Sequence, residues 1–120
     1  MSGKVGELSQ MVIRALSLNL KDGQSIFIGE MNINHMREKH PIDFARYANA
    51  LPQILATPDY VGLNPKDGSI EFVREFQLDD EYVKVAVRVS GGGELFARSL
   101  YVLNKRRVEN FIAQGKLKKM

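Results

Sequence analysis

The hydrophobic residues of this 120-residue chain change their spacing near residue 58, and this change constrains the fold more than any other feature. Before it, apolar residues recur at three- and four-residue spacing, as on a helix face; after it they alternate, as on a strand. Asp22-Gly23, Leu78–Glu81 and Gly91–Gly93 have the composition of tight turns. The pattern predicts an α+β domain with N-terminal helices, a three- to four-stranded antiparallel sheet and a C-terminal helix.

The same periodicity places the individual elements. We expect helices over residues 5–16, 32–40 and 42–56, and strands over 25–28, 69–77, 82–89 and 95–103. Residues 16–21 alternate strictly, so this stretch could instead begin a strand. Pro41 should end the second helix, and Pro52 should interrupt or divide the third. Asn104 is a good N-cap for a last helix, and Gly115 stands where a C-terminal cap belongs.

Composition limits the class of protein. A chain of 120 residues has room for one domain, expected over 1–120 with its core at about 5–115 and a basic tail at 116–120. Cysteine is absent, which excludes disulfides and thiol catalysis and suits a reducing cytosol. No apolar run approaches the roughly 20 residues that span a bilayer, and the N-terminus lacks a signal-peptide core. We therefore expect a cytoplasmic protein without membrane contact.

Positive charge gathers toward the C-terminus. The chain has 17 basic and 14 acidic side chains, yet residues 98–120 carry seven basic groups against Glu109 alone. Such a segment suits contact with a phosphate backbone. Part of it lies in the first turn of the last helix, at Lys105, Arg106 and Arg107, where the helix dipole favours anions. The alternative is a solvated helix and tail that keep the protein soluble.

The alternation also predicts what the sheet leaves uncovered. If Val83, Val85, Val87 and Val89 pack on the helices, then Lys84, Ala86 and Arg88 point away from them. On the next strand, the face opposite Phe96, Leu100 and Val102 carries Leu95, Ala97, Ser99, Tyr101 and Leu103. Lys84, Arg88, Ser99 and Tyr101 together could bind a phosphodiester and stabilise its added charge during transfer. The alternative is that they are ordinary solvent-side residues.

Only two histidines are present, His35 and His40. Five residues apart on a helix they lie about 140° around the axis from each other, so a shared metal ion is not expected. His40 should close its helix just before Pro41, at the negative end of the dipole, where a protonated ring is favoured. It could transfer protons, or it could cap the last carbonyls of the helix. A Ser99–His40–Asp59 triad lacks the glycine pattern of a nucleophile elbow.

Five segments in order resemble a known family. They are His35-Met-Arg-Glu-Lys-His-Pro41, Pro58-Asp-Tyr-Val-Gly62, Ser69-Ile-Glu-Phe-Val73, Val85-Ala-Val-Arg-Val89 and Phe96-Ala-Arg-Ser-Leu-Tyr-Val-Leu-Asn104. Together they look like the phage-associated branch of the barnase, EndoU, colicin and RelE-like nucleases. The resemblance covers about residues 5–119, and it implies helices followed by an antiparallel sheet whose open face holds the active site.

The resemblance implies a metal-independent ribonuclease that needs no cofactor. The matching residues are His35, His40, Arg88, Arg98, Ser99 and Tyr101. His40 would move a proton, with His35 as the second candidate, and Arg88 with Lys84 or Arg98 would stabilise the phosphorane-like charge. No glutamate–histidine pair of the barnase type can be placed. RNA is the expected partner, and an antitoxin or immunity protein would be a further one; the sequence indicates no oligomeric state.

Two other classes of protein fit the same residues. The first is an RNA- or protein-binding module that kept the fold and lost the chemistry, and the second is a phage–host interaction protein that acts through its surface. A geometric test separates them from the enzyme. If His40, Arg88 and Ser99 do not converge on one cleft, catalysis by this set of three fails.

Overall fold

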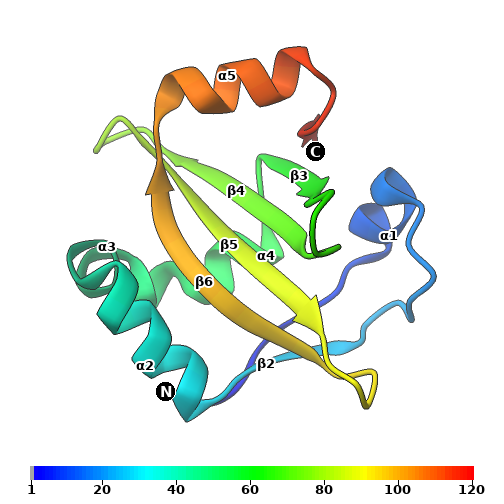
Figure 1. Ribbon diagram of the computed structural model, residues 1–120. Coiled ribbons are helices and arrows are strands. Elements are labelled where there is room, and N and C mark those ends of the chain that lie inside the picture. The colour runs from blue at the N-terminus through cyan, green and yellow to red at the C-terminus, as the bar shows by residue number, and fades with distance from the viewer. Residues whose placement is uncertain (1) are drawn as a thin grey trace.

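A seven-stranded mixed sheet forms the centre of the computed structural model, which describes residues 2–120 (Figure 1). Its strands are β1 (Gly3–Glu7), β2 (Ser25–Ile28), β3 (Tyr60–Leu63), β4 (Ile70–Phe76), β5 (Glu81–Val89), β6 (Leu95–Leu103) and β7 (Lys118–Lys119). They lie in the order β1-β2-β6-β5-β4-β3-β7. Neighbouring strands are antiparallel except for β2 and β6, which run parallel. The α+β class is confirmed, but the sheet is larger than the expected three or four strands.

Proline, asparagine and glycine mark several of the helix ends. The helices are α1 (Gln10–Leu16), α2 (Glu30–Lys39), α3 (Pro41–Tyr47), α4 (Leu51–Ala56) and α5 (Lys105–Ala113), with a 3₁₀ turn η1 (Ala48–Ala50). The expected helix over 42–56 is divided, with prolines in the first turns of α3 and α4. Asn104 caps α5 by accepting from the Arg106 N–H, and Gly115 follows the helix with a φ of 74°. Both expected caps are confirmed.

The expected helix over residues 5–16 is wrong in its first half. Residues 3–7 form β1, which pairs with β2, and the helix begins only at Gln10. Gly3 and Gly6 weaken any helix here, and Gly3 adopts a φ of 124° that other residues avoid. Ser9 then caps α1 by accepting from the Val12 N–H. The chain therefore opens on a strand, and N-terminal helices do not come first.

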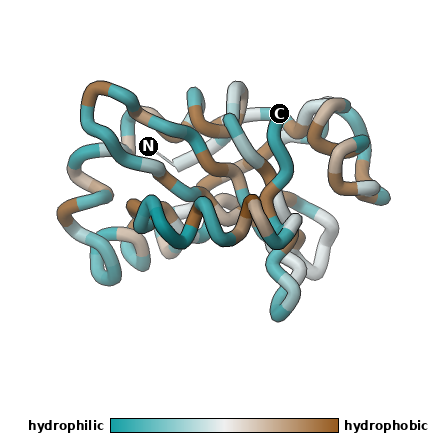
Figure 2. The backbone as a smooth tube through the Cα atoms, turned by 90° about the horizontal axis from the view of Figure 1, so that it is seen from above, coloured by the Kyte–Doolittle hydropathy of each residue, from teal (hydrophilic) through white to brown (hydrophobic). Residues whose placement is uncertain are grey.

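Most of the core lies between one face of the sheet and helices α1 to α4. Phe72, Val85 and Leu100 on adjacent central strands are fully buried there, and α4 lies behind the strands in Figure 1. Helix α5 packs on the opposite face at one end, through Val108 against Leu103. It alternates hydrophilic and hydrophobic residues along its length (Figure 2). The rest of that face carries no helix, and we call it the open face (Figure 1).

No helix within residues 2–120 is long and apolar enough to cross a membrane. The segment after α5 returns to the sheet: Leu117 is buried in the small cluster under α5, and β7 pairs with β3. Gly62 on β3 makes this return possible. A Cβ atom at Gly62 would clash with the Lys116 carbonyl oxygen and lie 3.1 Å from the Leu117 side chain.

We predict that Gly62→Ala lowers the free energy of unfolding by about 1–3 kcal/mol, because the added methyl group must displace backbone. Thermal unfolding followed by circular dichroism measures the change, with Gly91→Ala as the control. A Cβ atom at Gly91 would have nothing within 4 Å. Equal midpoints for the two variants would show that the C-terminal segment is not held against β3.

Candidate active site

Helix α2 lies along an edge of β6 that no strand covers. β2 pairs with β6 only at Leu95 and Phe96, so the later part of that edge lacks a strand partner. Ten helical residues span about 15 Å, close to the length of five strand residues. Beyond α2, Asp43 Oδ2 accepts a hydrogen bond of 3.0 Å from the Val102 N–H. This bond fixes the junction of α2 and α3 beside the second half of β6.

A β-bulge in β6 changes which side chains reach the open face. Ala86 pairs with Ser99 and Val87 with Ala97, so Arg98 has no partner on β5. A bulge shifts the alternation by one residue and re-aims the side chains around it. The expected face assignment is therefore wrong before the bulge: Leu95 and Ala97 are fully buried on the helical side. Phe96 moves to the open face, opposite Arg88.

Four of the expected site residues line one small cavity on the open face. The cavity has a volume of about 180 Å³. Its lining side chains come from α2, the β3–β4 loop and strands β5 and β6: His35, Asp67, Ser69, Ala86, Arg88, Arg98 and Ser99. It therefore combines an imidazole, two guanidinium groups and hydroxyl groups, which is a set that can hold and polarise a phosphodiester.

Asp67 adds a carboxylate to the cavity, and Ser69 holds it in place. Asp67 Oδ1 accepts from the Ser69 hydroxyl at 2.7 Å and from the Ser69 N–H at 2.9 Å. These hydrogen bonds lower the pKa of Asp67, and the charges of Arg88 and Arg98 lower it further. Neither arginine forms an ion pair among residues 2–120. Both guanidinium groups are thus available to an anionic ligand.

His40 lies outside this cavity, against Tyr101. The two rings stack with centroids 4.7 Å apart and an angle of 24° between their planes. His40 ends α2 and begins α3, and its side chain makes no capping hydrogen bond to α3. Tyr101 is two residues beyond Ser99 on the same face of β6. His40, Arg88 and Ser99 therefore do not converge on one cleft as expected; His35 takes the place beside Arg88 and Ser99.

Lys84 lies beside Tyr101 with its charge already paired. Its Nζ donates to Glu71 Oε2 at 2.7 Å and lies 5.0 Å from the centre of the Tyr101 ring. Burial lowers the pKa of Lys84, but the hydrogen bonds to Glu71 and Tyr101 and their charges outweigh it, so the pKa is raised. The ammonium is thus held in its charged form beneath Tyr101.

The three cations at the start of α5 face different surroundings. Lys105 Nζ lies 3.4 Å from Asp80 Oδ1, on the side of the β4–β5 turn. The Arg106 side chain is exposed, and its backbone N–H donates a hydrogen bond to Asn104 Oδ1. Arg107 lines a hollow of about 270 Å³ with Lys84 and Tyr101, where it also stacks over Phe111. Of the three, Arg107 is the one next to the candidate site.

Three site residues were missed by the sequence reasoning, namely Asp67, Ser69 and Glu71. The alternation within 69–77 could have found Glu71, because Ile70 and Phe72 face the core and the residue between them must face away. Asp67 and Ser69 stand at the loop–strand boundary, where no period applies. Within residues 2–120, no group of three or more His, Cys, Asp or Glu side chains is placed to hold a metal ion.

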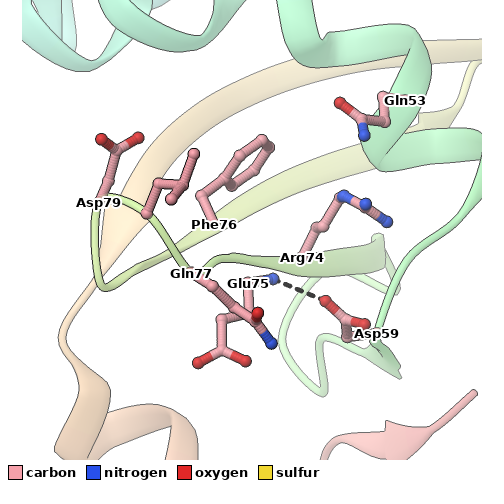
Figure 3. A pocket seen from close by; sticks show the side chains of 8 residues that line it. Gln53, Asp59, Arg74, Glu75, Phe76, Gln77 and Asp79 are labelled. Carbon is pink, nitrogen blue, oxygen red and sulfur yellow. Dashed lines mark hydrogen bonds between the residues drawn. The ribbon is translucent and has the colours of Figure 1, made fainter.

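Another hollow, of about 440 Å³, opens on the helical side of the sheet near the end of β4 (Figure 3). Some of its polar groups have partners within the protein, although the buried Arg74 Nε has none among residues 2–120. Asp59 Oδ2 accepts from the Glu75 N–H at 2.7 Å, and Arg74 donates to the carbonyl and hydroxyl oxygens of Thr57. The hollow contains no histidine. The chemistry of proton transfer therefore favours the open face.

Comparison with known families identifies the family of the chain. The model of the family described as phage-Barnase-EndoU-ColicinE5/D-RelE like nuclease3 matches residues 3–110. The match spans every strand and helix except α5's last turn and β7. Searches of curated proteins and of solved structures found no significant match.

We predict that Glu71→Gln lowers the free energy of unfolding by about 2 kcal/mol at pH 7. The loss is smaller than the roughly 3–5 kcal/mol for a fully buried pair, because both side chains keep some exposure. In the wild type, the raised pKa of Lys84 makes its contribution complete below the unfolded-state value near 10.4, and higher pH removes it. In the variant the pKa of Lys84 falls, so rising pH stabilises the folded state.

The difference between the two proteins should therefore shrink between about pH 8 and pH 11 in urea titrations. Glu75→Gln is the control, because its carboxylate lies on the same strand and pairs with no cation among residues 2–120. A difference that stays constant over this range would contradict the pairing of Lys84 with Glu71.

Proposed function

Because this chain belongs to the phage-Barnase-EndoU-ColicinE5/D-RelE-like nuclease family, we propose that its open face cleaves RNA without a metal ion. The family makes nucleic acid the substrate class. The choice of RNA, the mechanism and the residues that carry it are the substance of the proposal. The observation that supports it is the cavity where His35, Arg88, Arg98 and Ser99 meet.

The proposed reaction is an internal transesterification. The ribose 2′-oxygen attacks the adjacent phosphorus while a base removes the 2′-hydroxyl proton. The bond from phosphorus to the 5′-oxygen breaks, and an acid gives that oxygen a proton. The products are a 2′,3′-cyclic phosphate and a free 5′-hydroxyl group. Imidazole suits both proton transfers, because its ordinary pKa lies near neutral pH.

His35 lines the cavity with Arg88 and Ser99, which supports it as the histidine beside the bound phosphate. His40 lies outside the cavity, stacked on Tyr101, and is the second candidate for proton transfer. Tyr101 packs on the imidazole ring of His40, and the Asp43 bond to Val102 holds the helix junction that carries it. Lys84 acts through Tyr101 as a positioning residue.

Arg88 and Arg98 are proposed to bind the non-bridging phosphate oxygens. A phosphorane-like transition state carries one more negative charge than the substrate, and guanidinium groups held by a rigid strand need little rearrangement to meet it. Ser99 lies between them and Tyr101 and can donate its hydroxyl hydrogen to the same oxygens. The bulge at Arg98 lets adjacent residues of β6 serve one phosphate.

We predict that the protein cleaves single-stranded RNA in excess chelator, and that the all-deoxy strand of the same sequence stays intact. His35→Ala should lower kcat/KM by about 10²–10⁴-fold, and His40→Ala should lower it less, because His40 lies outside the cavity. Gel analysis with end-group labelling should find cyclic phosphate ends. Thermal unfolding of both variants shows whether they fold.

Three results would contradict this proposal. Cleavage that stops in chelator and returns with a divalent cation would overturn the metal-independent mechanism. Cleavage of the deoxy strand would exclude attack by the 2′-hydroxyl group. Binding without cleavage of any RNA would favour a binding module that keeps the fold.

For the arginines, we predict that Arg88→Ala lowers kcat by about 10²-fold, because a cation is removed from the charge that develops in the transition state. Arg14→Ala is the matched control, since Arg14 lies in the last turn of α1 and lines no part of the cavity. Steady-state kinetics on one RNA measures both. Equal activity of the two variants would remove Arg88 from the mechanism.

A further inference from the structure

A groove beside the proposed phosphate site has a different chemistry. It lies between the start of α2, the end of β5 and the start of β6, and its volume is about 520 Å³. Arg88 and Arg98 line both the groove and the cavity with His35, so the two are adjacent. The remaining lining includes Phe96, Met31 and Val89. The groove thus pairs an apolar wall with two cations at one end.

Several of its apolar side chains are exposed, although the protein has a well-formed core. Met31 keeps 86% of its exposure and Val89 keeps 47%. Phe96 is half-buried and reaches the open face only because of the bulge at Arg98. Phe27, its partner on β2, supports the ring with centroids 6.1 Å apart. A backed aromatic ring beside exposed apolar side chains is suited to stacking with a flat ligand.

We propose that this groove binds the nucleobase next to the scissile phosphate, stacked against Phe96 and covered by Met31. Resting on the proposed function, this inference adds a recognition site to it. Base stacking on aromatic side chains recurs in single-strand binding, and an arginine beside the ring serves the phosphate. The lining fits both parts of a nucleotide, because the apolar wall suits the base and the two cations suit the phosphate.

The charges also orient the nucleotide. Glu30 lines the groove beside Met31 on the first turn of α2, whereas the arginines come from β5 and β6. A carboxylate only accepts hydrogen bonds, so Glu30 can face the N–H groups of a base but repels a phosphate. The base therefore lies toward the start of α2, and the phosphate lies toward Arg88 and Arg98. From there the cavity with His35 and Ser99 continues along β6.

The test compares two probes that differ only in the base, adenosine 5′-monophosphate and ribose 5-phosphate. The full chain is titrated with each probe, and the changes in its amide chemical shifts give the two dissociation constants. We expect the nucleotide to bind at least about tenfold more tightly. Phe96→Leu should remove most of that difference, because it keeps apolar volume and loses the ring face. Phe96→Tyr should keep it.

Met31→Ser provides a second variant that should fold normally, because its side chain is almost fully exposed. It should weaken nucleotide binding and leave ribose 5-phosphate binding unchanged. Met11→Ser is the matched control on α1, where the side chain is 67% exposed and outside the groove.

The outcomes separate this inference from the proposed function. Equal affinities for the two probes, or no binding of either at millimolar concentration, would overturn the base site. A nucleotide preference that depends on Phe96 in a protein that cleaves no RNA would support the base site and contradict the ribonuclease. Cleavage of RNA by a protein that binds both probes equally would support the ribonuclease and overturn the base site.

Discussion

The short pairing of β2 with β6 is the constraint on which the rest of the open face depends. The two strands share only two residue pairs, so the polar edge of β6 beyond Phe96 needs another partner. Helix α2 lies along this edge, and from α3 the Asp43 carboxylate accepts a hydrogen bond from the Val102 N–H, which a further strand would have bonded. A longer β2 would have covered this edge and removed both histidines from the face that the arginines share.

The bulge at Arg98 is the second constraint, because it brings three kinds of side chain to one face of the sheet. Before the bulge, Phe96 faces the groove; at it, Arg98 and Ser99 reach the cavity; after it, Tyr101 supports His40. A regular strand would have buried Phe96 in the core and brought Ala97 to the open face. One inserted residue thus links an aromatic surface, an anion site and an imidazole along a single strand.

Much of the fold could be predicted because local chemistry determined it. Pro41, Asn104 and Gly115 fixed helix ends, and the alternation around Val85 identified the strands that form the centre of the sheet. The strands that were missed are all short, and two of them pair with segments far along the chain. β3 has four residues, β1 pairs with β2, and β7 has two residues and pairs with β3. Such pairings leave little local periodicity.

The candidate site, like the fold, could be predicted from the sequence only in part. The residue types and their strand were predictable, because Arg88, Ser99 and Tyr101 follow from alternation on neighbouring strands. The pairing of His35 with the cavity and of His40 with Tyr101 was not, because it depends on how α2 aligns with β6. Glu71 shows the converse case, because it was missed although alternation within β4 could have placed it on the open face, where it pairs with Lys84.

The most direct test of this account is a crystal structure with a dinucleotide whose attacking 2′-hydroxyl is replaced by hydrogen. The account predicts the phosphate between His35 and Ser99, with Arg88 and Arg98 on its non-bridging oxygens and one base against Phe96. A phosphate bound elsewhere, such as in the hollow beside Arg74, would contradict the assignment of the open face as the active site.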